Sequence, residues 1–132
     1  MLELHQVCKT FNPGTVNEKT ALNPLSLTLE EGEFVTVIGG NGAGKSTMLN
    51  AISGVWPVDA GTVRIDGVDV TELSEHQRAV YLGRVFQDPM VGTAGNMTIE
   101  ENLALAARRG EKRTLRWGIK KSEREQFKEL LR

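Results

Sequence analysis

An α/β fold is the class that the sequence predicts, because a strand pattern, a glycine-rich loop and a helix pattern follow one another without interruption. Residues 34–38 are apolar and mostly β-branched, which is typical of a strand buried on both faces. Residues 39–46 are rich in glycine, and residues 47–52 have the composition of a helix. A buried strand of this type needs parallel neighbours and covering helices, which is the architecture of α/β proteins.

The glycine-rich loop contains the complete pattern G-x-x-x-x-G-K-[ST]. Glycine allows positive φ angles, so that successive backbone N–H groups turn inward and form an anion-binding hollow at a helix N-terminus. Lys45 is expected to reach the β- and γ-phosphates of a nucleotide, and the Ser46 hydroxyl is expected to ligate Mg²⁺. We therefore predict a nucleotide site formed by Gly39, Gly40, Asn41, Gly42, Ala43, Gly44, Lys45, Ser46 and Thr47.

Two strands are predicted on the N-terminal side of this loop. Residues 2–7 alternate in polarity, which predicts a strand that ends near Lys9, and residues 25–29 alternate in the same way. Between them lies a polar stretch that contains Asn-Pro-Gly and runs to Thr20. Its composition predicts a loop.

A helix and a hairpin are predicted on the C-terminal side. The helix that begins at Lys45 is expected to end near Gly54, because glycine is a favourable C-terminal cap. Residues 61–65 and 68–70 are short strand patterns separated by Asp-Gly, which is the pair that a two-residue hairpin turn prefers. We expect an antiparallel hairpin there.

Two capped helices are predicted further along the chain. Ser74 is placed to cap a short helix over residues 75–81, and Thr98 is placed to cap a longer one that ends near Arg109. Between the two helices, residues 85–86 predict another buried strand, which leads into a loop punctuated by glycine and proline.

The C-terminal tail predicts the start of a further helix. Residues 122–125 form a capping box, and Phe127, Leu130 and Leu131 follow at helical spacing. The apolar face of this helix has barely begun at Arg132, so we expect a truncated sequence whose apolar side chains are exposed. A chain of this kind is expected to be marginally stable and prone to associate.

Composition and charge narrow the class of protein. The chain has 132 residues, a net charge of −1 and a single cysteine, so no disulfide framework is expected. It contains no apolar run that could span a bilayer and no signal pattern, so we expect a cytoplasmic protein. Lysine and arginine gather in residues 108–132, but glutamates are mixed among them. This mixture favours a solvated helical face over a nucleic-acid surface.

Further segments resemble the ATP-binding subunit of ABC transporters, and the resemblance extends over essentially the whole chain. Residues 7–11 are similar to the segment of that family that stacks on adenine, which implies that Phe11 contacts the base. Residues 85–89 are similar to the family's Q-loop, which implies that Gln87 contacts Mg²⁺ and the attacking water and senses the membrane subunit. Gln87 and Lys45 are the implied catalytic residues.

The resemblance also implies an architecture and partners. The expected fold is a P-loop NTPase of the ABC ATPase type, with a mixed sheet around the phosphate-loop helix, an antiparallel β subdomain and the start of a helical subdomain. Residues 1–97 would form the ATP-binding core up to and including the Q-loop, and residues 98–132 the incomplete helical subdomain. The implied cofactors are ATP and Mg²⁺. The implied partners are a membrane permease subunit, which holds the protein at the inner face of the membrane, and a second ATPase subunit, as in a homodimer.

Residues 85–102 look most like bacterial importers of small organic solutes such as amino acids. The family's Leu-Ser-Gly-Gly-Gln signature, its apolar strand ending in Asp-Glu and its switch histidine do not occur in these 132 residues. We therefore expect this chain by itself to bind ATP without hydrolysing it. The alternatives are an ABC-type ATPase that acts in DNA repair or on the ribosome, or a P-loop NTPase outside the ABC family, against which Phe11 and Gln87 argue.

Overall fold

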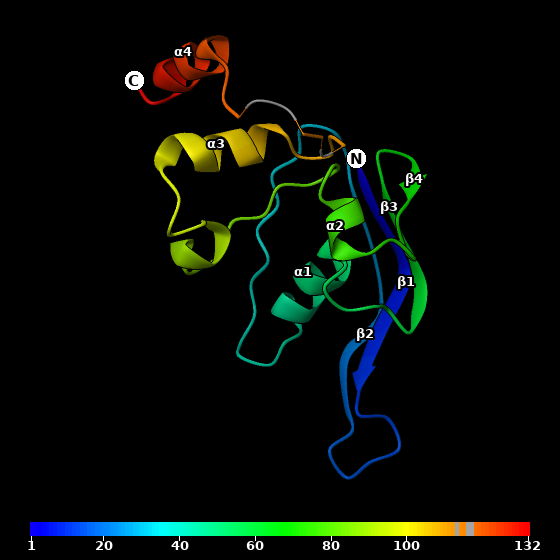
Figure 1. Ribbon diagram of the computed structural model, residues 1–132. Helices are drawn as coiled ribbons and strands as arrows, with labels where there is room; N and C mark the ends of the chain where they lie inside the picture. Colours follow the sequence, from blue (N-terminus) through cyan, green and yellow to red (C-terminus); the bar gives the residue numbers. More distant parts are fainter. Residues whose placement is uncertain (113, 116–117) are drawn as a thin grey trace. The chain divides into compact units, whose positions relative to one another are not determined.

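The structure of the chain is a computed structural model that describes residues 1–112, 114–115 and 118–132. Two compact units follow each other along the chain, Met1–Leu82 and Gly83–Arg132 (Figure 1). No helix in the described ranges combines the length and the apolar character that crossing a bilayer requires.

The first unit is built on a four-stranded antiparallel sheet with the strand order β2-β1-β3-β4. Strand β1 is central, and its Leu4 pairs with Leu27 on one side and Val63 on the other. The four strands are β1 Leu2–Phe11, β2 Lys19–Leu29, β3 Ala60–Ile65 and β4 Val68–Asp69.

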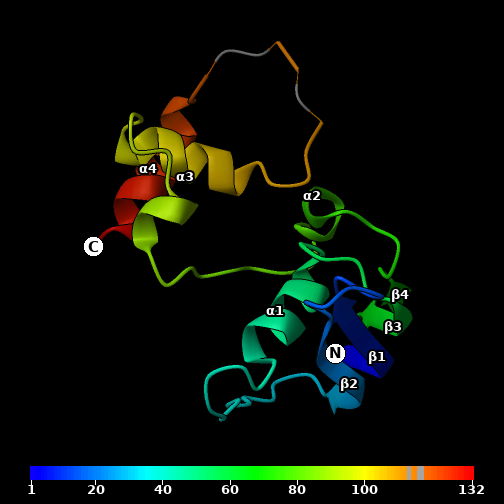
Figure 2. The same ribbon diagram turned by 90° about the horizontal axis from the view of Figure 1, so that it is seen from below.

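Helix α1, Lys45–Ser53, covers one face of this sheet (Figure 2). In β3 the buried Val63 and Ile65 flank the exposed Arg64, whereas in β1 two exposed residues separate the buried Leu4 from Val7, where the pairing register shifts. The buried residues of both strands give the sheet one apolar face. Met48 and Ala51 of α1 pack against that face. The buried core consists of Leu4, Val7, Leu22, Met48, Ala51, Val63, Ile65 and Val70.

The predicted hairpin is confirmed. Strands β3 and β4 are joined by Asp66 and Gly67, which have φ angles of 48° and 77°. Positive φ at both central positions is the requirement of the turn type whose twist matches the strands. The N-terminal amino group of Met1 donates to Asp66 Oδ1 at 2.7 Å and attaches the start of β1 to the turn.

Strands β1 and β2 extend further than predicted. The segment up to Thr20 was expected to be a loop, but β2 begins at Lys19, which pairs with Phe11 at the end of β1. Pairing between the two strands stabilises extended backbone that the local composition does not favour. Helix α2, Glu75–Arg78, is shorter than the predicted range, and the Ser74 N–H donates to Gln77 Oε1 at 2.9 Å to cap it.

The predictions of buried strands at residues 34–38 and 85–86 are wrong. Both segments lack strand pairing, and Phe34 and Val85 are 93% and 99% exposed. A strand that is apolar on both faces forms only when strands lie on both its sides and helices cover it. Within the described residues no strand pairs with either segment, so that their apolar side chains stay at the surface.

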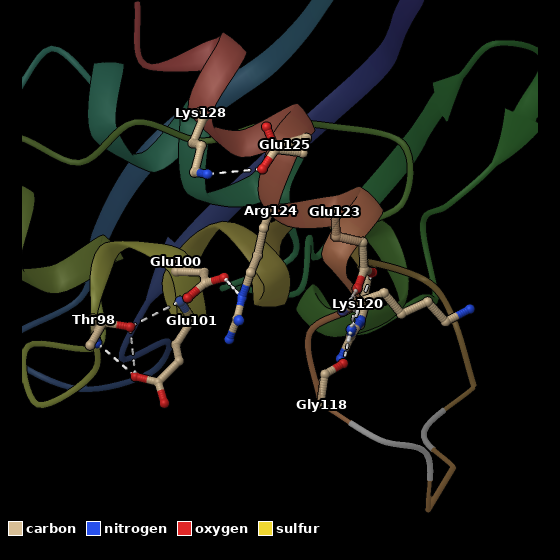
Figure 3. Close-up of polar contacts among 10 residues, drawn as sticks. Thr98, Glu100, Glu101, Gly118, Lys120, Glu123, Arg124, Glu125 and Lys128 are labelled. Atoms are coloured by element: carbon tan, nitrogen blue, oxygen red, sulfur yellow. Dashed lines mark hydrogen bonds and ion pairs between the residues drawn. The ribbon is translucent and has the colours of Figure 1, made fainter.

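The second unit contains the 3₁₀ helix η1, Pro89–Gly92, and the helices α3, Ile99–Ala107, and α4, Lys121–Leu130. The predicted cap of α3 is confirmed, because the Thr98 hydroxyl accepts from the Glu101 N–H at 3.3 Å and the Thr98 N–H donates to Glu101 Oε2 at 2.7 Å. Figure 3 shows this cap, the residues at the start of α4 and the ion pair between Glu100 of α3 and Arg124 of α4.

Helix α4 differs from its prediction in two respects. Its N-cap is Lys120, whose N–H donates to Glu123 Oε2 at 2.7 Å, so the helix begins before Ser122. Phe127 was expected to be exposed, but it is 7% exposed. Leu130 and Leu131 are exposed, as expected.

Candidate nucleotide site

The glycine-rich loop enters α1 through Gly44, which is the N-cap of the helix and has a φ angle of 87°. A Cβ atom at this position would lie 2.5 Å from the backbone oxygen of Ala21 in β2. Only glycine combines this φ angle with so close an approach to another strand. Gly42 also has a positive φ angle, of 84°. The backbone of the loop is therefore held against β2 at the point where α1 starts.

The Lys45 ammonium group lies inside the curve of the loop. Its Nζ donates to the backbone oxygens of Gly39 and Gly40 at 2.5 and 2.8 Å. These neutral acceptors hold the lysine tip at the loop, where phosphate oxygens would offer stronger, charge-assisted hydrogen bonds. The tip of Lys45 therefore lies at the loop that the sequence predicts to bind phosphate.

A hollow of about 260 Å³ opens beside the loop. Its lining combines hydrogen-bonding groups of the loop, the first residues of α1 and the ring of Phe11 from the end of β1. The lining residues are Phe11, Lys19, Ala21, Asn41, Gly42, Ala43, Gly44, Lys45, Ser46 and Thr47. Most of the predicted nucleotide residues thus surround one space. Gly39 and Gly40 do not line it, and their carbonyls face Lys45.

Lys19 is a lining residue that the sequence did not indicate. It pairs with Phe11 across β1 and β2, and its Nζ lies 3.8 Å from where a Cβ of Gly42 would be. A second ammonium group therefore lies beside the loop. The sequence around Lys19 is polar and predicts a loop. Its position beside the hollow results from the pairing of β1 with β2, which the local sequence does not predict.

Phe11 is half-buried and contacts Trp56 edge-to-face, with the ring centroids 4.8 Å apart and the planes at 81°. The Lys9 Nζ lies 5.7 Å from the centroid of the Phe11 ring. An aromatic ring at the rim of a phosphate-binding hollow is suited to stacking on a nucleobase. Trp56, like Lys19, is a neighbour that the sequence did not reveal.

The chemistry around Ser46 fits Mg²⁺. Ser46 is the second residue of α1, is exposed and lines the hollow together with Lys45. A hydroxyl oxygen is a hard ligand, and Mg²⁺ in nucleotide sites takes few protein ligands besides phosphate oxygens and water. No group of three or more His, Cys, Asp or Glu residues that could hold a metal ion occurs in the part of the chain that the structure describes.

Gln87 belongs to the second unit. It is exposed and directly precedes Asp88, whose carboxylate accepts from the Met90 N–H at 2.9 Å and caps η1. The loop that carries Gln87 is therefore held by a hydrogen bond at the following residue, Asp88.

A larger hollow, of about 520 Å³, lies between α3 and α4 in the second unit. Charged side chains in its lining are paired, since Arg124 bonds to Glu100 and Arg108 donates to both oxygens of Glu123 at 3.2 Å (Figure 3). Paired charges offer little to a charged ligand. The hollow at the glycine-rich loop is the one whose chemistry matches a nucleotide.

A family model described as ABC transporter matches residues 22–132. This chain belongs to the ABC transporter family. It is 42% identical over 111 residues to the tyrosine transport ATP-binding protein of Clostridioides difficile, and the match covers 84% of this chain and 44% of that protein. It is also 42% identical over 110 residues to the methionine import ATP-binding protein MetN 1 of Listeria innocua, covering 79% of this chain and 31% of that protein.

Solved ABC transporter cassettes share the fold. The dimeric ATP-binding cassette MJ0796, in a post-hydrolysis state bound to ADP and Pi, matches with a TM-score of 0.77 and 29% identity. The match covers 99% of this chain and 56% of that cassette. The predicted P-loop NTPase fold of the ABC ATPase type is thereby confirmed. The chain thus spans 44% and 31% of the length of the two transport proteins and 56% of the MJ0796 cassette.

Proposed function

We propose that this chain is the ATP-binding part of an ABC transporter ATPase subunit, which couples ATP binding and hydrolysis to solute transport across a membrane. The observation that carries the proposal is the hollow in which the glycine-rich loop, Lys45, Ser46 and Phe11 meet. Membership of the ABC transporter family supports the coupling of this site to transport.

The triphosphate would bind at the loop. The N–H groups at the start of α1 and the dipole of that helix favour negative charge. Lys45 would exchange the carbonyls of Gly39 and Gly40 for phosphate oxygens, a change that is favourable because both partners are then charged. Lys19 adds a second positive charge at the same rim.

Ser46 would ligate Mg²⁺, which would supply positive charge against the phosphates. Phe11 would stack on adenine, and stacking of this kind contributes about 1–3 kcal/mol per base. The phosphate end and the base end of the hollow are thus formed by different elements, α1 and β1. This separation allows their contributions to be tested independently.

Gln87 is the proposed link between hydrolysis and transport. A glutamine amide can accept from water and donate to it while it stays uncharged, so it suits a residue that orients the attacking water near Mg²⁺. We place residues 1–97, with the Q-loop, in the ATP-binding core and residues 98–132 in the helical subdomain. Lys45 and Gln87 are the proposed catalytic residues.

The partners follow from the family. A membrane permease subunit would hold the protein at the cytoplasmic face of the membrane, and a second ATPase subunit would complete the site. The dimeric state named for the MJ0796 cassette supports the second subunit. The names of the tyrosine and methionine transport relatives support a bacterial importer of small organic solutes such as amino acids.

The basic C-terminal tail supports this proposal over a role on nucleic acid. Arg124 pairs with Glu100, Arg108 with Glu123, and Lys128 donates to Glu125 at 2.8 Å (Figure 3). Cations that are neutralised by glutamates within the protein contribute little to binding phosphates. We therefore expect no nucleic-acid partner.

We further propose that the 132-residue chain alone binds ATP but releases no phosphate. Hydrolysis requires a positioned water and groups that stabilise the developing charge. Within these 132 residues the signature, the Asp-Glu strand end and the switch histidine of the family do not occur.

A transport assay tests the proposed function. In the organism that encodes this protein, Lys45→Ala is expected to abolish uptake of at least one labelled amino acid. Lys128→Ala, which removes an exposed cation that pairs with Glu125 of the same helix, is the matched control and should leave uptake unchanged. Unchanged uptake of every amino acid in the Lys45→Ala strain would contradict the proposed substrate class.

A further inference from the structure

The contact between Phe11 and Trp56 joins two segments that are distant in sequence. Phe11 ends β1, and Trp56 lies in the loop that follows α1. Their ring centroids are 4.8 Å apart and their planes are nearly perpendicular, at 81°. This edge-to-face geometry brings the positive edge of one ring to the negative face of the other. Perpendicular packing leaves at least one face of the Phe11 ring free of Trp56, whichever ring provides the edge.

The two rings differ in their relation to the nucleotide hollow. Phe11 lines that hollow, whereas Trp56 does not. Trp56 therefore contacts the Phe11 ring without being part of the lining of the hollow. A ring held by such a neighbour loses less rotamer freedom when the base binds, which favours stacking.

Trp56 is itself attached to the end of α1. The N–H groups of Val55 and Trp56 both donate to the Asn50 backbone oxygen, at 3.0 and 3.4 Å. Gly54, with a φ angle of 81°, turns the chain out of the helix just before them. Helix α1 carries Lys45 at its other end, so that one element supports both the phosphate end and, through Trp56, the base end of the hollow.

Asp59 fixes the backbone beside Phe11. Its carboxylate accepts from the Thr10 N–H at 2.6 Å and from Lys9 Nζ at 2.9 Å. These bonds lower the pKa of Asp59, with the Thr10 N–H as the larger cause and Lys9 as the next. The short segment between Trp56 and Asp59 thus contacts both the ring and the backbone at the end of β1.

We propose that Trp56 is a positioning residue for the base-stacking ring. It holds Phe11 in the orientation that presents a ring face to adenine, and it contributes to the affinity for the base but not for the phosphates. This inference rests on the proposed stacking of adenine on Phe11. Its test therefore measures the two ends of the ligand separately.

The experiment compares Mg²⁺–ATP with Mg²⁺–tripolyphosphate, which lacks the base, by calorimetric titration of the whole chain. Trp56→Leu keeps an apolar side chain but removes the ring. An edge-to-face pair is worth about 0.5–1.5 kcal/mol, so Trp56→Leu should lower the affinity for ATP by about two- to tenfold. The affinity for tripolyphosphate should not change. Trp56→Phe, which retains an aromatic ring, should restore most of the affinity for ATP.

A double variant completes the test. In the Phe11→Ala background, Trp56→Leu should cause no further loss of affinity for ATP, because the ring that Trp56 supports is gone. An equal loss for ATP and tripolyphosphate, or the same loss with and without Phe11, would overturn the positioning role. A normal affinity for ATP in Phe11→Ala alone would instead contradict the stacking role of Phe11. Failure of the proposed function is thereby distinguished from failure of this inference.

Discussion

Arg78 donates from its guanidinium Nη1 to the backbone oxygen of Ala51 at 2.7 Å, which ties α2 to the C-terminal turn of the phosphate-loop helix. Arg78 is 1% exposed. Its other bonds also go to backbone oxygens, those of Ile52, Thr71 and Leu73, at 2.8 to 2.9 Å. Burial is the main cause that lowers the pKa of its guanidinium, and the Asp69 and Glu72 carboxylates oppose that shift. The charge is stabilised by carbonyl dipoles at the negative end of α1.

We predict that Arg78→Met destabilises the first unit by about 3 kcal/mol, because buried carbonyls lose their donors. Arg64 provides a matched control, since it is exposed and donates to the Gly67 oxygen at 2.9 Å. Arg64→Met should change the free energy of unfolding by less than about 0.5 kcal/mol. Urea unfolding followed by circular dichroism measures both values. Equal losses of unfolding free energy in the two variants would show that the buried hydrogen bonds of Arg78 stabilise the unit no more than the exposed bond of Arg64.

Gly44→Ala should disrupt the phosphate loop. The new Cβ would meet the Ala21 oxygen at 2.5 Å, so either the loop or β2 must move. Gly14 has a similarly positive φ angle, of 75°, but no atom lies within 4 Å of a Cβ there. Gly14→Ala therefore carries the backbone strain without the collision. We expect titration calorimetry to show ATP binding lost in Gly44→Ala and retained in Gly14→Ala. An equal loss of binding in both variants would show that backbone strain, and not the collision with Ala21, is the cause.

Acid should loosen the helix caps of the second unit. Bonds from the Thr98 N–H and hydroxyl lower the pKa of Glu101, and bonds from the Lys120 N–H and from Arg108 lower that of Glu123. Because each folded-state pKa is below its unfolded value of 4.5, the stabilisation is present above pH 4.5 and is lost as pH falls through the folded pKa. Carboxyl chemical shifts recorded by NMR from pH 7 to 2 should show both residues titrating below ordinary glutamates. Titration of both at the ordinary value would contradict the caps.

Gln87→Ala, made in the assembled transporter, should lower stimulated ATP turnover more than the affinity for ATP. The reason is that the proposed role of Gln87 concerns the water and the permease, not the binding of phosphates. Steady-state phosphate release and nucleotide titration on the same preparation separate the two effects. A severalfold loss of ATP affinity with intact stimulated turnover would be incompatible with this assignment.

Features specified by local chemistry could be predicted from the sequence. The Asp66–Gly67 turn, the Gly54 cap and the Thr98 cap all depend on residues within one turn of the chain, and all three occur in the structure. The phosphate loop belongs to the same group, because its glycines and Lys45 act over a few consecutive residues.

Features that depend on distant partners could not be predicted in this way. Residues 34–38 have the composition of a buried strand but lack pairing strands in the described part of the chain, so they remain exposed coil. Lys19 lines the hollow because of the strand register, and Trp56 contacts Phe11 from the end of α1. Polarity patterns encode neither arrangement. Phe127 of α4 is 7% exposed, which the pattern of the tail sequence did not predict.

The most direct test of the nucleotide site is the affinity of Lys45→Ala for Mg²⁺–ATP, measured by calorimetric titration beside the native chain and Lys128→Ala. Charge-assisted hydrogen bonds contribute about 1.5–3 kcal/mol each, so the loss of Lys45 should weaken binding by at least about tenfold. Lys128→Ala should bind as the native chain does. Equal affinities in Lys45→Ala and the native chain would contradict the assignment of the glycine-rich loop as the phosphate site.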